Sequence, residues 1–269
     1  MAKSVLITGG SAGIGLALAA EFLAHGYSVI LVARNAQRLE AAAEVLRLTR
    51  DNGPQVSCLA MDVFAAEAPQ ALAAFLTDNG IELEMLVLNA AAWSQGEVVT
   101  IAADEARRIV YANIASVCEL AHALVPPMIE RRSGRVLVVG SLAGETPAST
   151  NAVYSASKAF LRSWTLSLRQ ELDRHGVGVS LLLPGVVSTD FVTERQAPDE
   201  SKQNEARLLF AATPQSVAWC GYRGLMTNQG VIVPGLFYGG VYLGLKLIPR
   251  RLAHRVRSFV TRQARTDAA

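Results

Sequence analysis

Short apolar runs that are rich in β-branched residues alternate with longer stretches of helical pattern along most of the chain. Several runs are apolar at almost every position, as in VLVVG at residues 136–140 and ILVA at residues 30–33. Strands that are buried on both faces have this composition, which favours a parallel sheet covered by helices. We predict strands at Ser4–Thr8, Ser28–Ala33, Gln55–Ala60, Glu84–Asn89, Arg135–Gly140, Val177–Leu183 and Gly230–Val233.

The segments between these runs have helical patterns and are long enough for right-handed crossovers between parallel strands. Glycines at 26, 53, 80 and 176 fall near expected helix ends, where a left-handed backbone favours glycine. The alternation therefore predicts a single-domain, doubly wound α/β Rossmann fold with about seven parallel strands. Residues 190–228 contain no clear strand, and we expect helices there, inserted between two strands.

Composition excludes several classes of protein. With 51% hydrophobic and 18% charged residues the chain is globular, and a net charge of +2 does not indicate a nucleic-acid partner. Its cysteines, Cys58, Cys118 and Cys220, are widely spaced and odd in number, so they predict neither a disulfide framework nor a metal site. We expect a reducing, cytoplasmic location, and no signal peptide because the first strand starts almost at Met1.

A glycine-rich turn, Thr8-Gly9-Gly10-Ser11-Ala12-Gly13-Ile14-Gly15, follows the first predicted strand, and a helix is expected to begin near Gly13. Glycines at such a turn let the backbone approach a phosphate, and the helix N-terminus adds positive potential. A tight turn without a ligand is also rich in glycine. Between the first strand and the first helix of a doubly wound fold, the turn favours dinucleotide binding.

The end of the second predicted strand bears on the choice of cofactor. An acid there binds the ribose 2′-hydroxyl of NAD, whereas an arginine accommodates the 2′-phosphate of NADP. Ala33 occupies the position of the acid, and Arg34 follows with a guanidinium that can bind a phosphate through two hydrogen bonds. Although an ordinary surface arginine is the alternative, we expect NADP(H) to be preferred over NAD(H).

Tyr154 and Lys158 are four residues apart, which places them on one face of a helix. A neighbouring ammonium stabilises a phenolate and lowers the tyrosine pKa from its usual value of about 10. A tyrosine with a lowered pKa can exchange a proton with a substrate near neutral pH. Taken alone, such a pair is more often part of an ordinary solvated helix face.

Together these motifs resemble the short-chain dehydrogenase/reductase family, from Ser4 to about Thr189. Asn89-Ala90-Ala91 is similar to the family's Asn-Ala-Gly after the fourth strand, with Ala91 in place of glycine, and Pro184–Thr189 to its Pro-Gly segment after the sixth strand. The resemblance implies that Asp62 contacts the adenine ring. The full set of cofactor-binding residues that it implies is Gly9, Ser11, Gly13, Ile14, Gly15, Arg34, Asp62, Val63, Asn89, Tyr154, Lys158, Val187 and Thr189.

The resemblance also implies a catalytic set of Asn113, Ser141, Tyr154 and Lys158. Ser141 would hold a substrate oxygen and Tyr154 would exchange its proton, while Lys158 would lower the Tyr154 pKa and bind the ribose hydroxyls. Asn113 would kink its helix and hold a water that links Lys158 to solvent. From the residues alone, Asn113 is expected to face solvent and Ser141 to cap a turn or helix.

The function implied is hydride transfer between a nicotinamide and the carbonyl or secondary alcohol of a small molecule, by a homodimer or homotetramer. Two alternatives are a catalytically silent NAD(P)-binding scaffold or sensor of the same fold, and an epimerase or dehydratase. The four intact catalytic residue types disfavour a protein that only binds the nucleotide.

We expect a catalytic domain over residues 1–249, with a substrate lid at about 190–213, and an extension at 250–269. In the extension, apolar residues recur at helical spacing among arginines, which predicts a basic amphipathic helix. Such a helix binds an anionic membrane surface or, alternatively, docks on a partner subunit or its own domain. The nearly uncharged run Val231–Leu245 is too short and broken to span a membrane. Membrane contact would favour an apolar, lipid-like substrate.

Overall fold

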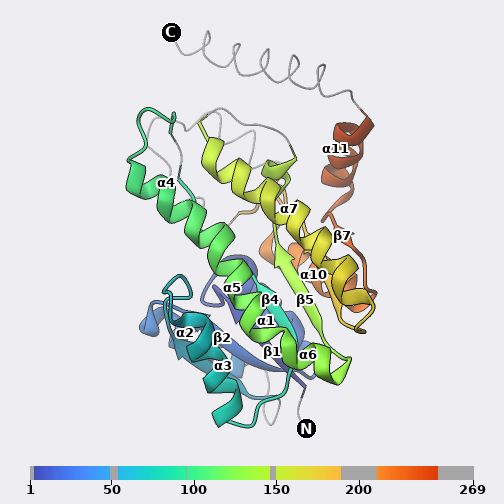
Figure 1. Cartoon of the computed structure of the whole chain (residues 1–269). Coiled ribbons are helices and arrows are strands. Elements are labelled where there is room, and N and C mark those ends of the chain that lie inside the picture. The colour runs from blue at the N-terminus through green and yellow to red at the C-terminus, as the bar shows by residue number, and fades with distance from the viewer. Residues whose placement is uncertain (1–2, 49–53, 95, 146–149, 189–210, 248–269) are drawn as a thin grey trace.

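The structure is a computed structural model that describes residues 3–48, 54–94, 96–145, 150–188 and 211–247. Seven strands form one parallel sheet in the order β3-β2-β1-β4-β5-β6-β7, which confirms the predicted doubly wound α/β fold (Figure 1). The observed bounds are close to the predicted ones: β1 Ser4–Thr8, β2 Ser28–Ala33, β3 Val56–Ala60, β4 Leu83–Leu88, β5 Arg135–Val139, β6 Gly178–Leu182 and β7 Val231–Ile232.

Helices cover both faces of this sheet (Figure 1). One face packs against α1, α2 and α10, and the other against α3, α5, α6 and α7. Two short helices of other types, η1 and η2, lie beside α7. The described helices are α1 Gly13–Ala24, α2 Ala36–Leu48, α3 Ala68–Asp78, α4 Ala103–Val110, η1 Tyr111–Ala115, α5 Ser116–Leu124, α6 Pro126–Arg131, η2 Leu142–Gly144, α7 Ala152–Asp173, α10 Pro214–Met226 and α11 Leu236–Leu247.

Burial on both faces explains the continuous apolar runs of the sequence. In β1, Val5 and Ile7 belong to the core beneath α1, whereas Leu6 belongs to the core on the opposite face, and all three are fully buried. Because β1 pairs with β2 on one side and β4 on the other, the connections diverge at this point of the sheet. In doubly wound folds, ligands bind at this divergence, beside the carboxyl ends of the strands.

The predicted left-handed glycines agree with the structure where it describes them. Gly26, Gly80 and Gly176 have φ angles of 86°, 61° and 72°, and each lies just beyond a helix end. Gly53 lies outside the described residues, as do most of the expected lid and the extension at 250–269. Helix α10 is one of the helices expected between the last two strands.

Helix α11 is an element that the sequence did not predict. It begins after Gly235, whose φ of 82° is left-handed, and it includes three further glycines that weaken a helical pattern. In Figure 1 it lies beside β7, at the carboxyl-terminal end of the described chain. Among the described helices, none is both long and apolar enough to cross a membrane.

Candidate active site

The glycine-rich turn has a shape that only glycine permits. Gly9 and Gly13 have φ angles of 67° and 56°, and a Cβ atom on Gly15 would lie 2.3 Å from the carbonyl oxygen of Gly9. The N-cap of α1 is Ala12, whose methyl group cannot accept a hydrogen bond from the first N–H groups of the helix. The turn therefore presents free backbone donors and a helix N-terminus to an anionic ligand.

Thr8 and Asn89 join the carboxyl ends of β1 and β4. The Thr8 hydroxyl accepts from the backbone N–H groups of Asn89 and Ala90, at 2.9 and 3.0 Å. In return, Nδ2 of Asn89 donates to the carbonyl oxygens of Thr8 and Gly9, at 2.9 and 3.2 Å. Asn89 thus fixes the glycine turn, and its contact with a cofactor stays a prediction. Thr8 begins the predicted glycine-rich turn, but it was not among the predicted cofactor-binding residues.

Residues predicted to contact the adenosine half of a cofactor lie at the ends of β2 and β3. The exposed Arg34 guanidinium lies 6.0 Å from the centre of the Phe64 ring, and the N–H of Phe64 donates to Oδ1 of Asp62 at 3.1 Å. Val63 is buried beneath them, and a hydrogen bond from Met61 N to Ala33 O joins the two strand ends. Arg34 and Asp62 are therefore close to each other, around Phe64.

Tyr154 and Lys158 both project from the first turns of α7, as their spacing predicts. Lys158 is buried, and its Nζ donates to the carbonyl oxygen of Val139, the last residue of β5, at 3.1 Å. The same Nζ lies 5.7 Å from the centre of the Tyr154 ring. The alternative of a solvated helix face is therefore wrong for Lys158.

Ser141 follows β5 and caps a helix, as expected from the residues alone, and it also lies beside Tyr154. Its Oγ accepts from the N–H of Ala143 at 3.1 Å, which caps η2, and it is also hydrogen-bonded to the hydroxyl of Tyr154. The close packing of η2 on α7 depends on Gly144, since a Cβ atom there would lie 2.6 Å from the carbonyl carbon of Lys158. The close packing at Gly144 thus keeps Ser141 beside Tyr154.

Asn113 is buried in a π-helical turn, η1, between α4 and α5, so the expectation that it faces solvent is wrong. Its Oδ1 accepts from Ala92 N at 2.8 Å, and its Nδ2 donates to Ala92 O and to Ser157 Oγ, at 2.9 and 3.0 Å. Ser157 in turn donates to the carbonyl oxygen of Tyr154 at 2.7 Å. Asn113 therefore connects the segment after β4 to the turn of α7 that holds the tyrosine.

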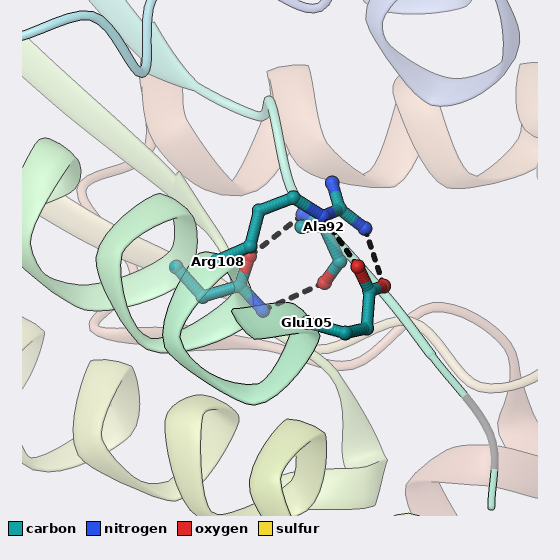
Figure 2. Close-up of polar contacts among 4 residues, drawn as sticks. Ala92, Glu105 and Arg108 are labelled. Carbon is teal, nitrogen blue, oxygen red and sulfur yellow. Dashed lines mark hydrogen bonds and ion pairs between the residues drawn. The ribbon is translucent and has the colours of Figure 1, made fainter. Parts of the chain in front are cut away.

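An ion pair beside Ala92 fixes the helix that leads into this π turn. Figure 2 shows the Arg108 guanidinium facing the Glu105 carboxylate, with two hydrogen bonds of 2.8 and 2.6 Å. The hydrogen bonds to Glu105 raise the pKa of Arg108 above its ordinary value. The pair spans one turn of α4, and nothing in the sequence distinguishes it from other pairs at helical spacing.

Burial shifts the pKa of Tyr154 upward, which is opposite to the expected direction. Burial raises the pKa of Tyr154 to about 12, and the hydrogen bond with Ser141 lowers it only in part. Burial also lowers the pKa of Lys158 to about 8. The expectation that Lys158 lowers the tyrosine pKa is therefore wrong for this structure, because burial disfavours the charged form of both groups. At neutral pH Tyr154 is a protonated phenol, which is the form that donates a proton.

In the Pro-Gly segment after β6, the backbone groups of Val187 are not used by the bridge that holds the segment. Ala212 N donates to Val186 O at 2.9 Å, and Ser188 N donates to Ala212 O at 3.1 Å, around a parallel bridge between Val187 and Ala212. In this pattern the N–H and C=O of Val187 itself point away from Ala212. Thr189, the other residue predicted to act here, lies outside the described residues.

Known proteins match most of this chain in sequence, and solved structures match it in fold. The model of the short chain dehydrogenase family matches residues 3–200. Ketoacyl reductase HetN from Nostoc sp. is 32% identical over 216 residues, which cover 80% of this chain and 72% of that protein. Among solved structures, a short-chain dehydrogenase from Sphingobium yanoikuyae in complex with NADPH is 26% identical, with a TM-score of 0.77 over 91% of this chain and 92% of its own. A 3-oxoacyl-[acyl-carrier protein] reductase from Brucella melitensis with bound NAD is also 26% identical, with a TM-score of 0.73 over 86% and 88%.

Proposed function

The chain belongs to the short-chain dehydrogenase family and is an oxidoreductase, and we propose that it transfers hydride between NADP(H) and the carbonyl or secondary alcohol of a small molecule. The observation that carries this proposal is the buried Lys158, whose Nζ donates to Val139 O and lies 5.7 Å from the centre of the Tyr154 ring, with Ser141 beside the tyrosine. A neutral donor, a protonated phenol and a buried amine are thus assembled at the end of β5. A scaffold that only bound a nucleotide would not need this arrangement.

The residues of the site fit a nicotinamide dinucleotide. The glycine turn leaves no room for a Cβ atom at Gly15, and it directs backbone donors to where a pyrophosphate would lie. The outward N–H and C=O of Val187 suit the carboxamide of a nicotinamide, which has one donor group and one acceptor. Lys158 would hold the ribose hydroxyls, and Asp62 the adenine ring. The cofactor, when bound, supplies the hydride.

In the direction of reduction, the protein's own groups handle the oxygen of the substrate. Ser141 would donate a hydrogen bond to a carbonyl oxygen, and Tyr154 would give that oxygen its proton as the carbonyl carbon gains hydride. The raised pKa of Tyr154 keeps the phenol protonated up to high pH, so the acid is present at neutral pH. Lys158, whose pKa is about 8, would hold positive charge close to the phenolate that forms.

A preference for NADP(H) over NAD(H) rests on Arg34. Its guanidinium is exposed at the end of β2, where the 2′-phosphate of NADP would lie, and Ala33 precedes it in place of an acid. The similar solved structures contain NADPH in one case and NAD in another, so the preference is a proposal for this chain alone.

An apolar or lipid-like substrate is favoured by the outer face of α11. Leu236, Phe237, Val241 and Leu243 are 98%, 54%, 39% and 58% exposed, and helical spacing puts them on one side, opposite Tyr238 and Tyr242. The sequence that follows α11 has arginines at 250, 251, 255, 257, 262 and 265 and no acid before Asp267. We propose that this apolar face and these cations together contact an anionic membrane surface.

Vesicle binding tests the membrane contact directly. The double variant Phe237→Asp/Leu243→Asp should lose co-sedimentation with vesicles that contain phosphatidylserine, while the control Leu48→Asp/Val99→Asp, at exposed apolar residues elsewhere, should keep it. Equal vesicle binding by the two double variants would refute the contact. If the first variant instead changed only the oligomeric state, the face would bind a second copy of the chain. A cytoplasmic location and a homodimer or homotetramer stay predictions from the sequence.

The function itself is tested by a screen of NADPH consumption across ketones, aldehydes and 3-ketoacyl esters. We expect turnover with at least one apolar carbonyl compound and none with Tyr154→Phe. Nucleotide binding without turnover on any compound would favour the catalytically silent alternative.

A further inference from the structure

Tyr238 of α11 lies directly against the Pro-Gly segment that follows β6. The N–H of Val186 donates to the Tyr238 hydroxyl at 3.1 Å. A Cβ atom on Gly185 would lie 2.2, 2.3 and 2.5 Å from three carbons of the Tyr238 ring. Gly185 is not among the residues with positive φ, so glycine is required here by the ring and not by the backbone angle.

The segment is held from three directions, and Tyr238 supplies one of them. Leu142 N donates to Pro184 O at 3.0 Å, which ties the segment to the loop of the catalytic serine. Ala212 bonds to Val186 O and to Ser188 N on the opposite side. The two hydrogen bonds with Ala212 fix the peptide planes on both sides of Val187. The Tyr238 hydroxyl accepts from Val186 N–H and so fixes the plane before them, between Gly185 and Val186.

We propose that Tyr238 is a positioning residue that orients the Val187 backbone toward the nicotinamide carboxamide. This inference rests on the proposed function, in which Val187 makes that contact. Tyr238 acts only through Val186 and Gly185, so its loss would leave the phosphate turn and the Arg34 region unchanged. Because hydride transfer requires close alignment of the nicotinamide with the substrate carbon, a looser segment weakens both cofactor affinity and transfer.

Two ligands that differ only in the nicotinamide separate this role from a general loss of structure. The probes are NADPH and ADP-ribose 2′-phosphate, which keeps the pyrophosphate, the 2′-phosphate and both riboses. Tyr238→Phe should raise the Kd of NADPH roughly 3- to 10-fold, the effect of one hydrogen bond, and leave the Kd of ADP-ribose 2′-phosphate within about twofold. The matched control is Tyr27→Phe, which removes another phenol hydroxyl, bonded to Met226 away from the site, and should change neither Kd.

A second pair of variants tests the contact of the ring with glycine. Gly185→Ala should weaken NADPH binding more than Tyr238→Phe does, because the new methyl group meets the ring. In a Tyr238→Ala background the same substitution should have an effect at least fivefold smaller, since its obstacle is gone.

Three results would overturn the inference. One is unchanged NADPH affinity in Tyr238→Phe, another is an equal loss of affinity for both probes, and the third is an equal effect of Gly185→Ala in both backgrounds. If the unaltered protein bound NADPH no more tightly than ADP-ribose 2′-phosphate, the nicotinamide would contribute no affinity. That result would refute the contact between Val187 and the nicotinamide in the proposed function, independently of any effect of the Tyr238 variants.

Discussion

Replacing Asn113 by alanine should destabilise the whole domain, because its buried amide joins the segment after β4 to α7. The variant loses three buried hydrogen bonds, two with the backbone of Ala92 and one with Ser157. Ala92 is 1% exposed, so its N–H and C=O would be left without partners and without access to solvent. At about 1 kcal/mol for each hydrogen bond, with a further cost for the unpaired groups, we expect a loss of about 2–4 kcal/mol in the free energy of unfolding.

This loss is measurable by urea and by thermal unfolding. For a domain of this size it corresponds to a decrease of roughly 5–12 °C in Tm. The matched control is Asn79→Ala, which removes one exposed hydrogen bond, from Nδ2 to Phe75 O, and should cost no more than about 1 kcal/mol. If Asn113→Ala melted within about 2 °C of the unaltered protein, or no lower than Asn79→Ala, the bridging role of Asn113 would be refuted.

Gly15→Ala should abolish NADPH binding, because its methyl group would lie 2.3 Å from Gly9 O, whereas Gly239→Ala, with nothing within 4 Å, should bind normally in the same titration. Arg34→Ala should raise the Kd of NADPH at least tenfold and leave that of NADH nearly unchanged; equal effects on both cofactors, or a similar effect of the exposed control Arg107→Ala, would contradict the role of Arg34. The pKa of Lys158 is lowered from 10.5 to about 8, so between these pH values the unfolded chain binds more protons than the folded chain. The free energy of unfolding therefore increases as pH rises through this window. Urea unfolding at pH 8 and pH 9.5 should show a contribution on the order of 2 kcal/mol that is absent in Lys158→Met, and parallel profiles for the two proteins would contradict the burial of a neutral lysine.

The sheet was predictable from the sequence because its strands are buried on both faces. Residues such as Val136, Leu137 and Val138 are apolar without alternation, and each is fully buried in the structure. The glycine turn was predictable for a similar reason, since Gly9 and Gly13 have a left-handed backbone that favours glycine and Gly15 has no room for a side chain. These constraints are local, and they are therefore visible in a short stretch of sequence.

Contacts between distant segments were not predictable. Nothing near Asn113 indicates that its amide is paired with Ala92, 21 residues earlier in the chain. The predicted direction of the Tyr154 pKa shift was wrong for the same reason. The spacing to Lys158 is visible in the sequence, but the burial that shifts the pKa of both groups comes from the fold. Tyr238 reaches Val186 from 52 residues away, on a helix whose glycines obscure its pattern.

The central claim is that Tyr154 transfers the proton in an NADP(H)-dependent reduction. The most direct measurement compares the unaltered protein with Tyr154→Phe, using NADPH oxidation with a carbonyl compound found in the screen, together with the Kd of NADPH. The account predicts that kcat falls at least about 100-fold while the Kd changes no more than about threefold, because the substitution removes only the acid hydroxyl. Turnover by Tyr154→Phe at a rate close to that of the unaltered protein would contradict it.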